Sequence, residues 1–327
     1  MTHADAPSVT ILLLCHKDER FIRASLEAAF AQTVPCEIIV SNDCSGDRTF
    51  DIAQEMVAQY HGHHRVSVRR NERNLGVAEH VNATVPLASG EIIVMMAGDD
   101  IAYPHRVAAT LDAFARNPRV TILGSDFDGI DEEGRAHPLR FRPRPDPFGL
   151  DAFVQAGRLI GLLGATIAFR REVFDRFGPI LGPIEDNALS LRGALLGQCL
   201  QLQDKLIQYR QHAGSVSAGV FARNESQDVA MRRRYERTIR FYRGTADDLE
   251  QCATQLPDLA GEGRRHVDDI LAMYRIEADS REALLERPRL HWVRPILRGL
   301  MQRGARRKSA ERALKLFVPR RWIGLRA

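Results

Sequence analysis

The chain has 327 residues, of which 44% are hydrophobic and 27% charged, and its formal net charge is +4. This composition is typical of a globular protein and excludes a mainly disordered, collagen-like or disulfide-scaffold chain. The longest nearly continuous apolar stretch, residues 159–169, falls well short of the roughly 20 residues that a membrane-spanning helix needs. No signal-peptide pattern opens the chain, so we expect a cytoplasmic protein.

Strand and helix patterns alternate through the first 125 residues. The continuous apolar run of residues 9–15 predicts a strand buried on both faces. Further strands are predicted over 37–40, 66–68, 91–96 and 120–124, and helices over about 21–29, 47–60, 77–85 and 104–117. Strands separated by helices of this length predict a doubly wound α/β domain with a mostly parallel sheet.

The pattern changes after residue 125. Residues 134–150 are rich in Arg and Pro and predict a long loop. Residues 159–170 and 201–209 predict two further strands around a helix over 188–196. From about residue 224 onward the pattern is helical and strongly charged.

Cysteines and histidines do not predict a zinc site. The five cysteines show no C-x-x-C spacing, and their odd number suits a reducing compartment. The histidine-rich segment 61–64 follows a predicted helix, away from the other polar strand ends, and we interpret it as a solvated loop.

Three predicted strands end in polar residues, which are His16-Lys17-Asp18, Asn42-Asp43 and Gly98-Asp99-Asp100. Open parallel sheets bind ligands at the carboxyl ends of their strands. No glycine-rich phosphate loop follows the first strand, which argues against a dinucleotide-binding fold or a P-loop enzyme. If a nucleotide binds, carboxylates holding a divalent cation would be a way to neutralise its phosphates, since Mg²⁺ and Mn²⁺ favour oxygen ligands.

Six segments in order resemble family 2 glycosyltransferases of the GT-A fold, over roughly residues 8–220. They are VTILLLCHKDERFI, IIVSNDCSGDRT, NERNLGVAEHVNATVPLASGEIIVMMAGDD, GATIAFRREVFDRFG, IEDNALSLRGALLG and YRQHAGSVS. The resemblance implies a GT-A-like, mostly parallel twisted sheet flanked by helices, in an inverting enzyme of the bacterial surface-glycan type. It divides the chain into a nucleotide-sugar-binding half (1–125), an acceptor-binding and catalytic half (126–222) and a helical, basic C-terminal extension (223–327).

On the donor side, the resemblance implies that Asp43 binds the nucleobase, beside Asn42, where the family's paired acid is replaced by an amide. It also places His16, Asn74 and Asp99 at the donor nucleotide. Turn formation is the alternative for the Asn42-Asp43 segment, because Asn, Asp, Ser and Gly all favour turns. We expect Asp47 to cap the following helix, and Gly76 to permit a turn.

The implied metal site is Gly98-Asp99-Asp100, which stands where the family has its D-x-D motif. Ala97 occupies the position of the first acid, so Asp99 becomes the main expected ligand of Mn²⁺ or Mg²⁺, with Asp100 beside it. Two adjacent carboxylates repel each other, and a cation between them and the substrate offsets that repulsion. The alternative is a solvated loop before the helix at 104–117.

The implied catalytic pair is Glu185-Asp186. An inverting transfer needs a carboxylate that removes the proton of the acceptor hydroxyl, and Asp186 is our candidate for that base, with Glu185 as its neighbour. The alternative is an N-cap for the helix that follows. The resemblance also places Arg210 and His212 near the diphosphate, where they would contact phosphate oxygens; a structural role is the alternative for His212.

The tail is strongly basic. Residues 286–327 contain thirteen Lys and Arg but only two acidic residues, interspersed with Trp and large aliphatic side chains. Such a segment predicts either peripheral contact with a membrane surface or a solvated helix packed through its apolar face. Nucleic acid is not expected as a partner, because the remainder of the chain shows no nucleic-acid module.

Together these features predict a metal-dependent inverting glycosyltransferase that uses a nucleotide-diphosphate sugar, with UDP favoured, and a glycan or lipid-linked acceptor. It would be cytoplasmic, and peripheral at the inner face of the membrane if the basic tail contacts lipid. One alternative is a sugar-phosphate nucleotidyltransferase, but CHKDERF lacks the glycines of its loop. The other alternative is a non-catalytic nucleotide-binding member of the fold. It stays open because Ala97 stands where the family's metal-binding motif has its first acid.

Overall fold

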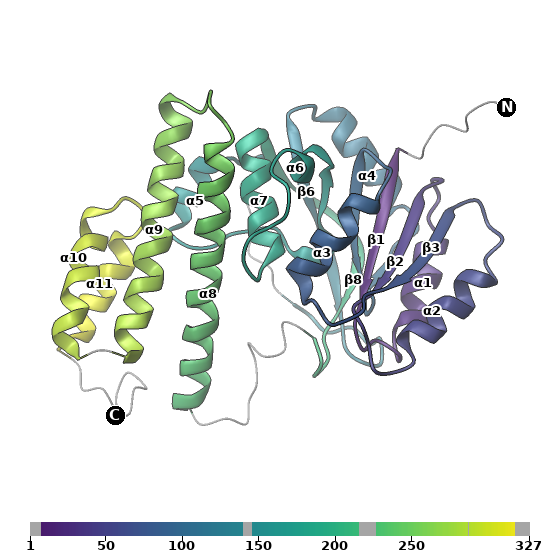
Figure 1. The fold of residues 1–327 in the computed structure, drawn as a ribbon, viewed down its shortest axis with the longest axis horizontal. Coiled ribbons are helices and arrows are strands. Elements are labelled where there is room, and N and C mark those ends of the chain that lie inside the picture. The colour runs from purple at the N-terminus through teal and green to yellow at the C-terminus, as the bar shows by residue number, and fades with distance from the viewer. Residues whose placement is uncertain (1–7, 140–145, 216–226, 287, 318–327) are drawn as a thin grey trace.

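A computed structural model describes residues 8–139, 146–215, 227–286 and 288–317 (Figure 1). Its centre is an eight-stranded sheet with the strand order β3-β2-β1-β4-β7-β6-β8-β5. The strands are β1 (Val9–Cys15), β2 (Glu37–Asn42), β3 (Arg65–Arg70), β4 (Ile92–Ala97), β5 (Ile101–Ala102), β6 (Val120–Ile130), β7 (Ala168–Arg170) and β8 (Gln198–Arg210).

Strands β1 to β4 form the parallel half of the sheet. In this register Cys15 at the end of β1 lies opposite Asn42 of β2, and Leu14 lies opposite Ala97 of β4. The carboxyl ends of these strands therefore meet at one edge. Strand β7 is antiparallel to both β4 and β6, whereas β8 runs parallel to β6 with irregular register.

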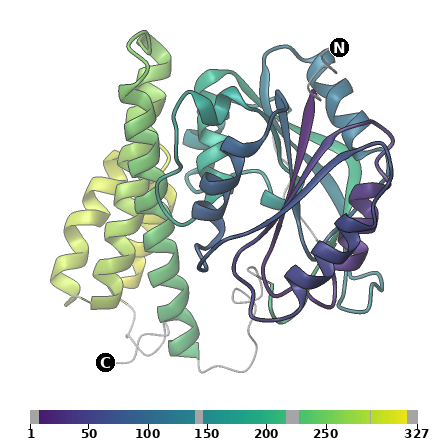
Figure 2. The same cartoon turned by 45° about the vertical axis from the view of Figure 1, so that its right-hand side comes forward.

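Helices cover both faces of the sheet (Figure 2). One hydrophobic cluster joins the sheet to α1 (Ile22–Phe30), α2 (Thr49–Ala58) and α4 (Arg106–Arg116). A second cluster joins the opposite face to α3 (Val77–Thr84), α5 (Leu150–Ala156), α6 (Glu172–Asp175) and α7 (Glu185–Leu196). Because both faces are buried, β1 and β4 consist mainly of apolar residues.

The predicted strand over 159–170 is wrong except for its last three residues, which form β7. Before β7 the chain forms a loop and a short 3₁₀ helix, η2 (Gly164–Thr166). The loop is apolar because it packs against the first turns of α7, to which it is tied by backbone hydrogen bonds. The Gly161 N–H donates to Asn187 Oδ1 (3.0 Å) and the Leu162 N–H to Ser190 Oγ (3.0 Å).

The C-terminal region begins with two long helices, α8 (Gln227–Thr254) and α9 (Gly261–Glu286). Their buried residues belong to the same hydrophobic cluster as α5 and α7. Arg192 of α7 also forms an ion pair with Asp248 of α8 (2.6 Å), and both side chains are 1% exposed. The C-terminal helices therefore share a core with the sheet domain.

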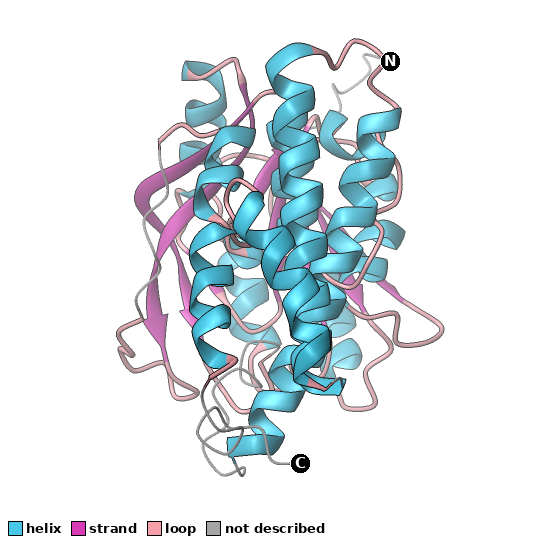
Figure 3. Cartoon of the chain, turned by 90° about the vertical axis from the view of Figure 1, so that its left-hand side faces the viewer, coloured by secondary structure: helices cyan, strands magenta, loops and turns pink. Residues whose placement is uncertain are grey.

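Two shorter helices, α10 (Val293–Met301) and α11 (Arg306–Lys315), complete the bundle outside α9, after the 3₁₀ segment Arg289–Trp292 (Figure 3). Trp292 and Ile296 are buried against Ala283 and Leu284 of α9. Within the described ranges, no helix is both long enough and apolar enough to cross a bilayer.

Candidate active site

Three loops bring Asp18, Asp99 and His212 together. Asp18 follows β1, Asp99 follows β4 and His212 follows β8, so the group depends on the folded sheet. One ligand atom from each residue lies within 4.8 Å of the other two. His212 Nε2 is 3.0 Å from Asp99 Oδ2, and these side chains are only 9% and 18% exposed.

Backbone contacts fix the Asp18 side chain. The N–H of His16 donates to Asp18 Oδ2 (2.9 Å), and the Asp18 N–H donates to Thr49 Oγ1 at the start of α2 (2.8 Å). A Cβ atom at Gly98 would lie 2.5 Å from Asp18 Oδ2. Position 98 therefore requires glycine for Asp18 to reach Asp99.

The electrostatics of this group favour a cation. Burial, and after it the nearby Asp99 carboxylate, raise the pKa of Asp18 to about 7, against the lowering effects of the His16 hydrogen bond and of His212. A divalent cation would relieve the repulsion between these two carboxylates. Two carboxylates and one imidazole are suitable ligands for Mn²⁺, and the carboxylates for Mg²⁺. The residues present therefore fit a divalent metal.

Asp100 and Arg210 lie beneath this cluster and do not join it. Asp100 is 1% exposed and accepts a hydrogen bond from the Arg210 N–H (2.8 Å), and burial, followed by Asp99, raises its pKa well above the usual range. The Arg210 guanidinium donates to the carbonyl oxygens of Asp99, Asp131 and Glu132. In this structure Asp100 supports the cluster from inside, and the Arg210 guanidinium holds Asp99 through its carbonyl oxygen. The expected roles of Asp100 at the metal and of Arg210 at the diphosphate stay predictions.

The expected donor-side residues His16, Asp43 and Asn74 do lie together. His16 Nδ1 is 2.8 Å from the Asp43 carbonyl oxygen, and His16 Nε2 is 3.0 Å from Asn74 Nδ2. The Asp43 carboxylate accepts hydrogen bonds from Asn71 Nδ2 and from the N–H groups of Leu75 and Gly76. Burial alone would raise the pKa of Asp43, but these hydrogen bonds outweigh it and lower the pKa, so the carboxylate is ionised.

Asn42, Asp47 and Gly76 shape the turns around this site. Asn42 is fully buried, and its amide exchanges hydrogen bonds with Ser45 Oγ (2.7 Å) and the Ser45 N–H (2.9 Å). Asn42 therefore stabilises the turn over residues 42–45 from its buried side and does not face the donor side. Asp47 Oδ1 accepts a hydrogen bond from the N–H of Thr49, the first residue of α2, but Arg48 occupies the N-cap position in place of the expected Asp47. The turn into α3 needs a φ of +77° at position 76, which glycine adopts readily because it has no Cβ atom.

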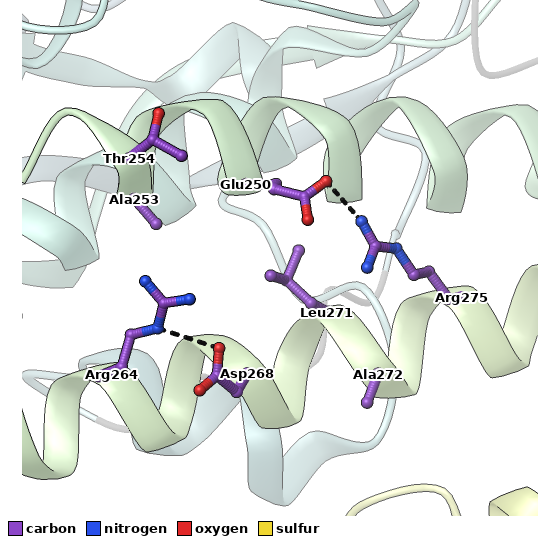
Figure 4. A pocket seen from close by; sticks show the side chains of 8 residues that line it. All are labelled: Glu250, Ala253, Thr254, Arg264, Asp268, Leu271, Ala272 and Arg275. Carbon is purple, nitrogen blue, oxygen red and sulfur yellow. Dashed lines mark hydrogen bonds and ion pairs between the residues drawn. The ribbon is translucent and has the colours of Figure 1, made fainter.

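A cavity of about 400 Å³ opens beside the cluster. Its lining comes from the loop after β1, from Asp47, and from the ends of β6 and β8; it includes His16, Lys17, Arg20, Phe21, Glu132 and His212. A second hollow of about 270 Å³ lies between α8 and α9 (Figure 4). Its charged side chains are paired with one another, Glu250 with Arg275 and Arg264 with Asp268, so we do not assign it a ligand.

Glu185 and Asp186 occupy the first turn of α7, where both are half-buried. Burial, and then the Asp186 carboxylate, raise the pKa of Glu185 to about 8. Asp186 Oδ1 accepts hydrogen bonds from the Asn187 N–H and side chain. A Cβ atom at Gly164 would lie 2.7 Å from Glu185 Oε1, so the η2 loop passes directly over this pair.

Comparison with known proteins identifies the family. The model for glycosyl transferase family 2 matches residues 10–178, which is more than half of the chain. The chain belongs to this family. The match confirms the family predicted from the six segments, and it includes Asp18, Asp43 and Asp99.

Relatives of this family 2 glycosyltransferase are distant. An uncharacterized protein of Mycobacterium bovis is 26% identical over 211 residues, covering 64% of this chain and 60% of the relative. An uncharacterized glycosyltransferase of Nostoc is 21% identical over 242 residues, covering 71% of this chain and 74% of the relative. The chain thus matches about 60% of the length of the mycobacterial relative.

Solved structures show the same fold. Residues 1–349 of TarS from Staphylococcus aureus, in complex with UDP-GlcNAc, superpose with a TM-score of 0.58 at 17% identity, covering 94% of this chain and 90% of TarS 1–349. A mannosyltransferase from Pyrobaculum calidifontis, in complex with GDP-Man and Mn²⁺, gives 0.53 at 16% identity, covering 98% and 84%. These matches confirm the predicted GT-A fold.

Sequence reasoning did not place Asp18 with Asp99 and His212 in the candidate metal-binding cluster. A signal was present, because Asp18 belongs to the polar segment that ends the first predicted strand. The sequence does not show that Asp18 lies close to Asp99 and His212. This proximity arises because the loops after β1, β4 and β8 meet at one edge of the sheet.

Proposed function

We propose that this family 2 glycosyltransferase moves a hexosyl group from a nucleotide-diphosphate donor to an acceptor hydroxyl, with inversion at the anomeric carbon. The observation that supports the proposal is that two groups of polar side chains lie next to each other at one edge of the sheet. The cation-binding cluster of Asp18, Asp99 and His212 lies beside the His16–Asp43–Asn74 group through the short loop 16–18. A nucleotide-sugar donor needs one site for its nucleobase and one for its diphosphate, and these two groups of residues would supply them.

The cluster would hold Mn²⁺ or Mg²⁺. When bound, the cation supplies positive charge at the leaving diphosphate. Asp99 and His212 hold their side chains in contact at 3.0 Å, and Asp18 completes the set from the loop after β1. The Arg210 guanidinium keeps Asp99 in place through its carbonyl oxygen (2.9 Å).

Asp186 is the proposed base that removes the proton from the acceptor hydroxyl. With its pKa raised to about 8, Glu185 holds a proton at neutral pH, which disfavours Glu185 as the base. The Asn187 N–H and side chain orient the Asp186 carboxylate. The attacking oxygen bonds to the anomeric carbon, its proton goes to Asp186, and the nucleoside diphosphate leaves.

The proposal also names the donor and the acceptor that we expect at this site. We expect Asp43 to contribute to recognition of the base, with UDP-sugars favoured, and a glycan or lipid-linked molecule to supply the hydroxyl. TarS and the Pyrobaculum mannosyltransferase, which share the fold, were solved with UDP-GlcNAc and with GDP-Man and Mn²⁺. A lipid-linked acceptor would bring the chain to the inner membrane surface, so peripheral membrane contact through residues 286–327 is part of the proposal.

The test is release of nucleoside diphosphate from UDP-GlcNAc, UDP-Glc, UDP-Gal and GDP-Man by the full chain, with Mn²⁺ or with EDTA. We expect release from at least one donor, dependent on the cation and abolished by Asp186→Asn. Asp151→Asn, an exposed acid in the first turn of α5, is the matched control and should retain the activity. Tight nucleotide binding without turnover of any donor would favour the non-catalytic alternative that Ala97 suggests.

A further inference from the structure

The outer surface of α10 carries an apolar stripe that no described part of the chain covers. Leu297 is 55% exposed and Met301 82%, while Val293 and Leu300 are more than a third exposed. At 100° per residue these four positions fall within an arc of roughly 100°. Leu290, in the 3₁₀ segment that precedes the helix, is 81% exposed.

This stripe is distinct from the side of α10 that packs on the bundle. Trp292, Ile296 and Gly299 point to the opposite side, where all three are buried against α9 and α11. The helix is therefore apolar on two sides, and only one of them packs against other described residues. Leu314 and Phe317 of the neighbouring α11 end add two further apolar side chains, 70% and 86% exposed.

Basic side chains border the stripe. Residues 288–317 contain nine Lys and Arg and a single acid, Glu311. Lys308 and Arg312 face inward to Glu277 of α9. Arg294, Arg298, Arg303 and Arg306 are exposed, and none of them forms an ion pair with another described residue.

We propose that α10 and the end of α11 form a surface that binds anionic lipid headgroups, with the apolar stripe inserted at the membrane interface. A helix with an exposed apolar face bordered by Arg has the composition of an interfacial element. A second copy of this surface would bring like charges together. A nucleic acid would pair with the arginines but leave the stripe exposed to water.

The position of the surface suits this role. Figure 1 shows that α10 begins and α11 ends at the lower end of the bundle, and that β1, in the sheet domain, runs downward in the same view. The carboxyl ends of the parallel strands, which carry the Asp18–Asp99–His212 cluster, point the same way. The surface itself is argued from exposure and charge, independently of the proposed reaction.

The test is flotation of the full chain with vesicles of phosphatidylcholine alone, or of phosphatidylcholine and phosphatidylglycerol in equal parts. We expect the protein to float with the anionic vesicles, and less at high salt. The double variant R294Q/R298Q should weaken partition into anionic vesicles about 25-fold at low salt, which is about fivefold for each Arg. L297D/M301D should weaken it by more than about tenfold.

Matched controls are R23Q/R119Q, two exposed arginines on the sheet domain, and L87D, where the side chain is 52% exposed. These should float like wild type, and all variants should release nucleoside diphosphate like wild type. Equal binding to neutral vesicles, or no flotation of the wild type, would overturn the proposal. So would a dimer in light scattering that L297D/M301D dissociates, or duplex DNA binding in place of vesicle binding.

Discussion

Replacing Glu277 with Gln should weaken the attachment of α11 to α9. Glu277 is fully buried in α9 and accepts ion pairs from Arg281 (2.6 Å), Lys308 (3.3 Å) and Arg312 (2.7 Å). Arg281 belongs to the same helix, whereas Lys308 and Arg312 come from α11. One carboxylate therefore balances three cations, two of which hold the outermost helix in place.

The size of the effect follows from the pKa of Glu277. Burial alone would raise this pKa, but the hydrogen bond and charge of Arg312, followed by the charges of Arg281 and Lys308, lower it from 4.5 to about 2. That difference corresponds to about 3 kcal/mol of stabilisation at neutral pH. Because the folded pKa is lowered, the stabilisation is present above pH 4.5 and is lost as the pH falls toward 2. Removing one partner of a buried ion pair is expected to cost a similar amount.

Urea unfolding followed by tryptophan fluorescence measures this loss. The chain has two tryptophans, and Trp292 is buried in the cluster between α9 and α10. In a Trp322→Phe background the fluorescence therefore reports on the bundle. Glu250→Gln is the control, because Glu250 pairs with Arg275 while both side chains are about half exposed. The reasoning is refuted if Glu277→Gln lowers the unfolding free energy no more than Glu250→Gln, or if the loss is unchanged between pH 7 and pH 2.

Three further predictions concern the site and the core. Gly98→Ala should weaken Mn²⁺ binding about tenfold or more in calorimetric titration, because its Cβ would clash with Asp18; Gly46→Ala, where nothing lies within 4 Å, should not. Arg192→Leu should lower the free energy of unfolding by about 3–5 kcal/mol in urea, since it leaves a buried Asp248 charge unpaired. The raised pKa of Glu185 means that wild type loses stability as pH rises from 4.5 to about 8. Glu185→Gln should therefore melt higher than wild type at pH 9 and equally at pH 4; the reverse order would contradict the raised pKa.

The parallel half of the sheet was predictable because strands buried on both faces consist of continuous apolar runs, as in β1 and β4. The same rule failed over 159–170. That segment is equally apolar, but its glycines let it pack against α7 as a loop, and burial alone does not distinguish the two.

The sequence predicted individual residues of the candidate site, but not the contacts between them. His16, Asp43 and Asn74 share the expected edge, because the parallel registers of β1 with β2 and of β2 with β3 bring their loops together. Asp99 and Asp100 are adjacent in sequence, yet only Asp99 faces His212, while Asp100 turns into the core. Which of two neighbouring acids reaches a ligand depends on packing that a motif does not contain.

The most direct test of the central claim is thermal unfolding of the full chain with UDP, GDP, CDP and dTDP, each with and without Mn²⁺, in wild type and Asp99→Asn. A nucleotide at about 100 times its Kd adds roughly 2.7 kcal/mol to the folded state, which raises the Tm by several degrees. We predict such a shift for one nucleotide, dependent on Mn²⁺ and absent in Asp99→Asn. No shift with any nucleotide, or an equal shift without Mn²⁺ and in the variant, would contradict a cation-dependent donor site at the Asp18–Asp99–His212 cluster.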